Sequence, residues 1–298
     1  MKRRFAFGLY GLLAGAALSS FPFQAAGELN LERDSVYNHI TVKQEGSERC
    51  MLFGRRNQQR QTCVDVNDPV KPIFEYTSMM CVGFLFNPKP QRVALLGLGG
   101  GYIPLLFQKY YPDVQLEVVE IDKVVVELAQ KHFFFKPGPK LSCTIADGRQ
   151  HLKRDRHRYD QIWIDAFNGD YIPAHMTTLE FLRLAKSRLA EGGIVIQNVH
   201  NTNALYDAQL ATFRGAFKTV YVFTGHKSGN SVFVASDEKL REPRELLKEL
   251  KSRREVRLGQ IDLVAELGKY EAETGSAGGK LLTDDYSPAN LLMFKARN

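Results

Sequence analysis

The sequence has little cysteine, and its few cysteines form no metal-binding pattern. Four cysteines occur among 298 residues, too few for a small protein held together by disulfides. The sequence has no Cys-x-x-Cys pair and no cluster of cysteine with histidine, so we predict no metal site. It also lacks internal repeats and low-complexity tracts, and 44% of its residues are hydrophobic against 24% charged. This composition excludes a disordered, collagen-like or multi-spanning membrane protein and indicates one large or two small globular domains.

A strong excess of one charge is also missing. The 40 Lys and Arg residues exceed the 33 Asp and Glu residues by seven, and three of these positive charges are Lys2, Arg3 and Arg4. The rest of the chain therefore has an excess of only +4, which is weak evidence for binding to nucleic acid. We therefore expect no nucleic-acid partner.

Residues 1–26 have the pattern of a targeting segment. The basic start at Lys2 is followed by an apolar run from Phe5 to Ala17 and by the small residues Ala25-Ala26-Gly27. This order predicts a secretory signal peptide and a periplasmic or secreted protein. One alternative is an uncleaved membrane anchor, because 5–23 is nearly long enough to span a bilayer. The other is a wrongly assigned start, which would leave the protein in the cytoplasm.

Residues 28–71 predict a small β domain of short strands and turns. Within it, Cys50 and Cys63 are separated by 12 residues, and each adjoins a short apolar stretch. If these stretches pair as a hairpin around the polar segment 54–60, the two thiols lie opposite each other. In an oxidising compartment they could then form a disulfide. The alternative is two unrelated, half-buried thiols.

Residues 72–298 predict a second, α/β domain, because apolar strands alternate there with amphipathic helices. Such alternation is typical of a parallel sheet with helices on both faces. The last two strands are joined by a short turn, which predicts an antiparallel hairpin at one edge. The predicted strands are 92–96, 116–121, 141–146, 160–165, 194–198, 220–224 and 231–235.

A glycine-rich loop and a following acid predict a nucleoside site. Gly97, Gly99 and Gly101 lie between the first strand and a helix, where glycine lets the backbone approach a ligand. Glu120 ends the next strand, about 20 residues on, where a carboxylate can accept hydrogen bonds from two ribose hydroxyls. These residues together indicate an adenosine-containing cofactor. The alternative is that the glycines serve only a tight turn.

The chemistry of this loop favours a cofactor without phosphates. The NAD fingerprint needs a glycine where Tyr102 stands, and the Gly-Lys-Ser/Thr of a P-loop is missing. An adenosyl-sulfonium fits the loop better. After the third strand, Asp147 and Gly148 add a second carboxylate at the same sheet edge, suited to the amino group of adenine.

The loop after the fourth strand is the candidate for chemistry. Asp165 ends this strand, and Asn168 and Asp170 follow it, so all three would face the reactive end of the cofactor. A carboxylate there can hold an amine acceptor and take its proton while the amine attacks a carbon beside the sulfonium. The alternative is a loop-capping aspartate without a chemical role.

These motifs together resemble the spermidine synthase (polyamine aminopropyltransferase) family. The resemblance implies a Rossmann-like, S-adenosylmethionine-dependent methyltransferase fold, with a mostly parallel seven-stranded sheet and a small N-terminal β domain. It also implies aminopropyl transfer from decarboxylated S-adenosylmethionine to an amine, without a metal, by a possible homodimer. The site residues that the likeness implies are Glu120 on the ribose, Asp147 on the adenine, Asp165 as the acid at the acceptor, Tyr76 in the polyamine channel and Gln61 near the cofactor.

Three positions depart from the family pattern. Gly100 stands where the family's loop has Asp, Tyr76-Thr77-Ser78 replaces Tyr-His-Glu, and Asn168 replaces a second acid. A dicationic diamine needs anionic partners, and several are missing here. The chain therefore resembles the divergent spermidine-synthase-like branch of the family. Two alternatives stay open: a methyltransferase that uses S-adenosylmethionine, and a non-catalytic exported protein that binds a nucleoside or polyamine.

Overall fold

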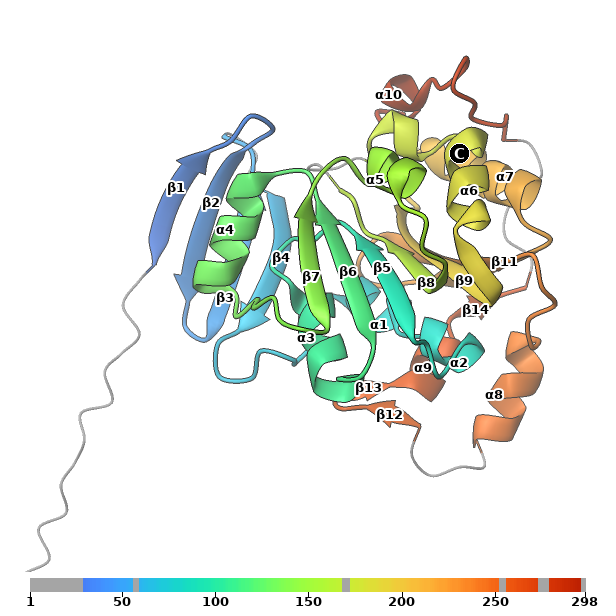
Figure 1. Cartoon of the computed structure of the whole chain (residues 1–298), viewed down its shortest axis with the longest axis horizontal. Coiled ribbons are helices and arrows are strands. Elements are labelled where there is room, and N and C mark those ends of the chain that lie inside the picture. The colour runs from blue at the N-terminus through green and yellow to red at the C-terminus, as the bar shows by residue number, and fades with distance from the viewer. Residues whose placement is uncertain (1–28, 56–58, 168–171, 252–255, 273–278, 296–298) are drawn as a thin grey trace, which may run out of the picture.

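The described part of the chain forms a small sheet and a larger sheet (Figure 1). Residues of both sheets line one cavity. The structure is a computed structural model that describes residues 29–55, 59–167, 172–251, 256–272 and 279–295. The predicted signal peptide and the predicted substrate residues Asn168 and Asp170 lie outside these ranges. Across these ranges, we find no helix with the length and apolar character needed to cross a membrane.

The small sheet is an antiparallel meander of four strands. It consists of β1 (Asn30–Asp34), β2 (His39–Glu45), β3 (Glu48–Phe53) and β4 (Gln59–Asp65), paired in chain order. Pairing of β3 with β4 places Cys50 opposite Cys63, and the two form a disulfide. The disulfide that the sequence left open is therefore present, and it links the last two strands of the small sheet.

The larger sheet has eight strands in the order β14-β10-β11-β9-β8-β5-β6-β7. It holds the seven expected strands and a further two-residue strand, β14, at the hairpin edge. Five strands from β7 to β9 run parallel, and the others are antiparallel, which confirms the predicted Rossmann-like α/β fold. The bounds are β5 (Arg92–Leu96), β6 (Gln115–Glu120), β7 (Leu141–Ile145), β8 (Tyr159–Ile164), β9 (Leu189–His200), β10 (Thr219–Thr224), β11 (Asn230–Ser236) and β14 (Tyr270–Glu271).

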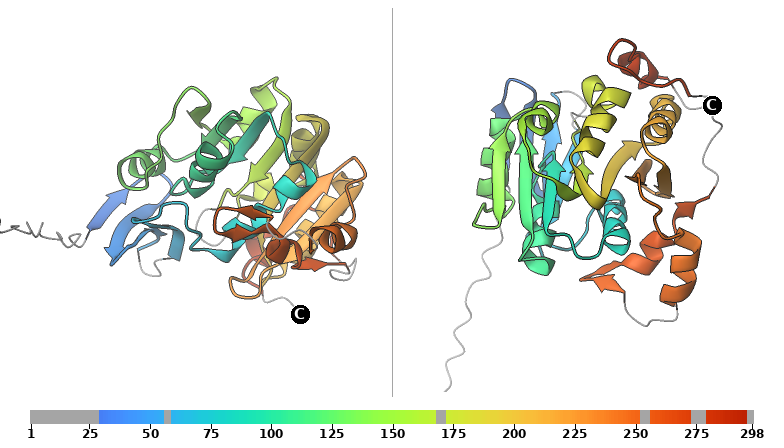
Figure 2. Two further views of the ribbon diagram at one scale, coloured as in Figure 1. Left: turned by 90° about the horizontal axis from the view of Figure 1, so that it is seen from below. Right: turned by 45° about the vertical axis from the view of Figure 1, so that its right-hand side comes forward.

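Helices cover both faces of this sheet, as the two views of Figure 2 show. One apolar core lies under α5 (Gly148–Arg154), α6 (Leu179–Ser187) and α7 (Leu205–Ala216). The other core lies under α1 (Glu75–Met80), α2 (Gly83–Phe86), α3 (Tyr102–Tyr110), α8 (Pro243–Lys251) and α9 (Leu263–Leu267). The remaining short elements are η1 (Ala174–Met176), β12 (Arg257–Leu258), β13 (Ile261–Asp262) and α10 (Ala289–Leu292).

Helix α4 (Lys123–His132) joins the two sheets. Its N-cap is Asp122, whose side chain accepts a hydrogen bond from Val124 N at 2.9 Å. Val125 and Leu128 on this helix pack with Ile40 and Met51 of the small sheet in one buried cluster. The small sheet is thereby fixed beside the strand ends of the larger sheet (Figure 1), and β4 reaches the cavity.

Candidate functional site

A cavity of about 720 Å³ lies where the carboxyl ends of β5, β6 and β8 meet the small sheet and α1. The strand order changes direction between β5 and β8, and such a switch point is where α/β sheets bind ligands. Most of the predicted site residues within the described ranges line this cavity: Gln61, Tyr76, Gly97, Gly99, Glu120, Asp147, Gly148 and Asp165. Gly101 does not line it and instead serves as the N-cap of α3.

The glycine loop brings two strand ends into close contact. Gly97 has φ of +100°, and a Cβ there would lie 2.2 Å from the backbone oxygen of Asp165. Asp165 N in turn donates to Leu96 O at 2.9 Å. Glycine is therefore needed at position 97 for both conformation and space. The contact fixes the distance between the predicted nucleoside end and the predicted reactive end.

Gly100, the departure in the loop, is explained by the small sheet. A Cβ at this position would lie 2.8 Å from Thr62 Cγ2 and 3.0 Å from Phe133 Cδ1. Thr62 is 8% exposed and Phe133 is fully buried, so neither can move aside easily. The loop therefore has no room for the aspartate of the family pattern unless Thr62 changes as well.

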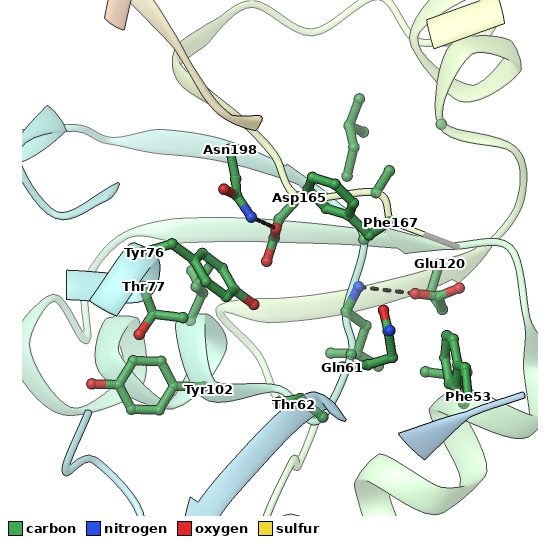
Figure 3. A pocket seen from close by; sticks show the side chains of 18 of the residues that line it. Phe53, Gln61, Thr62, Tyr76, Thr77, Tyr102, Glu120, Asp165, Phe167 and Asn198 are labelled. Atoms are coloured by element: carbon green, nitrogen blue, oxygen red, sulfur yellow. Dashed lines mark hydrogen bonds between the residues drawn. The ribbon is translucent and has the colours of Figure 1, made fainter. Parts of the chain in front are cut away.

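Glu120 lies at the end of β6 with its carboxylate held by backbone amides. Glu120 Oε2 accepts from Leu98 N and Oε1 from Asp122 N, both at 2.9 Å. Burial raises the pKa of Glu120, and the two amides oppose that shift. In Figure 3 the Gln61 side chain from β4 lies on the same side of the cavity as Glu120. Each carboxylate oxygen keeps a second lone pair, so the group can still accept bonds from ribose hydroxyls.

Asp147 already has two partners. Its Oδ1 accepts from Gln150 N at 2.8 Å and so caps α5, while its Oδ2 lies 2.7 Å from His175 Nε2. His175 also lines the cavity, and sequence reasoning missed it because nothing in the chain marks its proximity to Asp147. An adenine amino group would therefore meet a carboxylate that is already oriented by the helix and the imidazole.

Asp165 lies in a polar group of side chains from distant segments (Figure 3). Asn198 Nδ2 donates to Asp165 Oδ1 at 3.0 Å, and the Tyr76 hydroxyl is hydrogen-bonded to the same carboxylate. Burial raises the pKa of Asp165 to about 6, against the lowering effect of these two bonds. Burial and the adjacent Asp165 also raise the pKa of Tyr76, which stays a neutral phenol.

Sequence reasoning missed Asn198 as a site residue, although a signal was present. Asn198 is the last residue of the predicted strand 194–198, and carboxyl ends of parallel strands share one edge of the sheet. Asn230 also lines the cavity, but its position depends on the β10–β11 hairpin and has no such signal. Phe167 lines the cavity beside Asp165 (Figure 3).

Two groups of potential metal-binding side chains occur in the described ranges, and neither lies in this cavity. One contains Cys50 and Cys63, whose sulfurs are joined in the disulfide. The other is Glu117, Asp155 and His157, whose two carboxylates both bond to the Tyr159 hydroxyl. The cavity itself contains Glu120, which can accept hydrogen bonds from a ribose, and Asp165, which can accept a proton near neutral pH.

Comparisons with known proteins bear on the family and the fold of this chain. The model of the spermine/spermidine synthase domain matches residues 73–224. A polyamine aminopropyltransferase from Vibrio vulnificus is 36% identical over 271 residues, which cover 88% of this chain and 90% of that protein. Among solved structures, a probable spermidine synthase from Corynebacterium glutamicum matches with a TM-score of 0.68 and 20% identity, over 87% of this chain and 98% of the other. A spermidine synthase in complex with the transition state analogue AdoDATO matches with a TM-score of 0.61 and 20% identity, over 82% and 84%.

Proposed function

Because this chain belongs to the spermine/spermidine synthase family, we propose that it transfers an aminopropyl group from decarboxylated S-adenosylmethionine to an amine. One observation carries the proposal: Glu120 and Asp165 line the same cavity at the ends of β6 and β8. A nucleoside sulfonium has a sugar at one end and an electrophilic carbon at the other. Glu120 can bind the sugar, and Asp165 can bind the amine that attacks the carbon.

At the donor end, the chain holds and orients the nucleoside. Glu120 accepts hydrogen bonds from the ribose hydroxyls, while hydrogen bonds from Leu98 N and Asp122 N keep its carboxylate oriented. Asp147 accepts a hydrogen bond from the adenine amino group, and Gln61 lines the part of the cavity that holds the sugar. Because the sulfonium is already a good leaving group, orientation is the main task of these residues.

At the acceptor end, Asp165 binds the amine and removes its proton. The amine lone pair attacks the carbon next to the sulfonium, the carbon–sulfur bond breaks, and its electron pair goes to sulfur to give methylthioadenosine. The proton lost by the attacking nitrogen moves to Asp165, whose pKa of about 6 leaves it ionised at neutral pH. The Tyr76 hydroxyl and Asn198 hold the carboxylate in place.

The direct test is incubation of the protein with decarboxylated S-adenosylmethionine and a panel of mono-, di- and triamines. We expect methylthioadenosine to be released with at least one amine. Asp165→Asn should lower the rate of this release by about 10³-fold while the protein still binds methylthioadenosine. If no amine supports release, the proposal is wrong. Formation of S-adenosylhomocysteine from S-adenosylmethionine in the same assay would replace it with methyl transfer.

We also propose that the protein functions outside the cytoplasm. The Cys50–Cys63 disulfide supports this, because such bonds persist mainly in oxidising compartments, and so does the pattern of residues 1–26. Cell fractionation with mass spectrometry of the N-terminus tests it. A processed protein in the exported fraction is expected, and an unprocessed protein in the cytoplasm with reduced cysteines would contradict it.

A further inference from the structure

The amide that holds Asp165 is itself oriented by a second amide. Asn198 Nδ2 donates to Asp165 Oδ1, and Asn230 Nδ2 donates to Asn198 Oδ1, both at 3.0 Å. Asn198 and Asn230 are 2% and 5% exposed, so neither side chain has ready access to water. An amide has one accepting oxygen and one donating nitrogen. Donation from Asn230 to the Asn198 oxygen therefore turns the Asn198 nitrogen toward Asp165.

Asn230 lies at the end of the β10–β11 turn, and Glu75 fastens that turn. The Glu75 carboxylate accepts from the backbone N of His226 at 3.3 Å, of Lys227 at 2.9 Å and of Ser228 at 3.1 Å. It also pairs with Lys269 Nζ at 3.0 Å, and its side chain is only 14% exposed. The turn is closed by Gly225 N donating to Asn230 O at 2.9 Å, so fixing the turn fixes Asn230.

Helix α1 contacts both parts of this arrangement. Glu75 and Tyr76 are consecutive, and the first binds the turn while the second bonds to Asp165. We propose that Asn230 and Glu75 are positioning residues for Asp165. Asn230 determines whether Asn198 presents its amide nitrogen or its oxygen to the Asp165 carboxylate, and Glu75 fixes the turn that carries Asn230. This inference rests on the proposed function for its effect on rate, but not for its effect on Asp165 itself.

The orientation of Asn198 decides which form of Asp165 is favoured. With its nitrogen toward Asp165, Asn198 stabilises the ionised carboxylate that takes the proton from the amine. If Asn198 were reversed, its carbonyl oxygen would face Asp165, and the contact would be favourable only with a protonated carboxyl. We call the two hydrogen bonds from Asn230 to Asn198 and from Asn198 to Asp165 the relay. The relay therefore keeps the Asp165 carboxylate ionised, which is the form that takes the proton from the amine.

The sharpest test is Asn230→Asp, which keeps the shape of the side chain but removes its donor. Asn198 would then donate to the new carboxylate and turn its oxygen to Asp165. We expect the acid limb of kcat/KM for methylthioadenosine formation to move to higher pH by about one unit, with the KM for the donor little changed. Asn203→Asp is the matched control, because Asn203 Oδ1 accepts from Leu205 N at 3.2 Å and Asn203 does not line the cavity. Its acid limb should stay in place.

A simple charge effect must be separated from the relay. Asn230→Asp leaves the other ionisable groups of this cavity unchanged, which among the described residues are Tyr37, Arg60, Glu75, Tyr76, Tyr102, Glu120, Asp122, Asp147, His175, His200 and Lys227. The same Asn230→Asp change is therefore made in an Asn198→Ala background. The shift of the acid limb should fall by more than half there. An equal shift in both backgrounds would overturn the relay.

A measurement that needs no turnover separates this inference from the proposed function. The titration of Asp165 is followed by carboxyl ¹³C NMR in ¹³C-Asp protein, with Asp165→Asn to assign the signal. Asn230→Asp should raise its midpoint, and Glu75→Gln should raise it less while far-UV circular dichroism stays native. Shifted midpoints without methylthioadenosine release with any amine would support the relay and contradict the proposed function. Release with unchanged midpoints would do the reverse.

Discussion

The donor end and the acceptor end of the cavity are built in different ways. At the donor end, Glu120 and the glycine loop follow two adjacent parallel strands, and backbone amides hold Glu120 in place. At the acceptor end, Asp165 is held by Tyr76 and Asn198, which come from segments far apart in the chain. The donor end is therefore set by strand order, whereas the acceptor end depends on how distant elements pack.

This difference explains where the chain can depart from its family. Where the backbone itself forms the site, a residue can be replaced only if there is space for the new side chain. Gly100 is an example, because Thr62 fills the space that a side chain at this position would need. A site built from side chains can change one residue at a time. Thr77 lines the acceptor end where the family pattern has histidine, without disturbing α1.

The largest expected effect breaks the acceptor end alone. Asp165→Asn should lower kcat for methylthioadenosine formation by about 10³-fold, because the amide cannot take the proton from the amine. The dissociation constant for the donor, measured by titration calorimetry, should change little. In the unmodified protein kcat/KM should fall as the pH drops below about 6, because protonation of Asp165 removes the base. A donor affinity that falls together with kcat would show that the two ends are not separate.

The next effect concerns the small sheet, which contributes Gln61 to the donor end. Replacing Cys50 and Cys63 by serine should lower the free energy of unfolding by about 3 kcal/mol, as urea titration would measure it. Cys63 follows Gln61 and Thr62 in β4, so affinity for the donor should also weaken while the pH profile of Asp165 stays unchanged. A shifted profile with native affinity for the donor would contradict this assignment.

A smaller effect breaks the donor end alone. Glu120→Gln keeps one acceptor but loses the charge and one of the two backbone bonds, so the dissociation constant for the donor should rise about tenfold. At saturating donor, kcat and the KM for the amine should remain close to those of the unmodified protein. A fall in kcat at saturation would place Glu120 at the reactive end.

The smallest expected effect sharpens the boundary between the two ends. Gln61→Ala should raise the dissociation constant for the donor only a few-fold, because an uncharged hydrogen bond contributes about 1 kcal/mol. The pH dependence of kcat/KM should not move, since Gln61 lies beside Glu120 and not beside Asp165 in Figure 3. A pH profile altered by this change would mean that the small sheet also acts on Asp165.

Sequence reasoning reached the donor end more completely than the acceptor end. Strand ends and a glycine loop are local signals, so Gly97, Glu120, Asp147 and Asp165 could be placed at one sheet edge from their spacing alone. Gly101 was assigned to the cofactor, but the structure uses it to begin α3. Asn230 and His175 could not be found in this way, because their contacts with Asn198 and Asp147 depend on how the β10–β11 hairpin and the short helix η1 pack against distant strands.

The most direct test of the account is a crystal structure with methylthioadenosine and a diamine bound together. Both ribose hydroxyls should lie within hydrogen-bond distance of Glu120, the sulfur should face Asp165, and a nitrogen of the diamine should contact the Asp165 carboxylate. A nucleoside bound in the reverse direction, or one bound outside the space between these two carboxylates, would contradict the account.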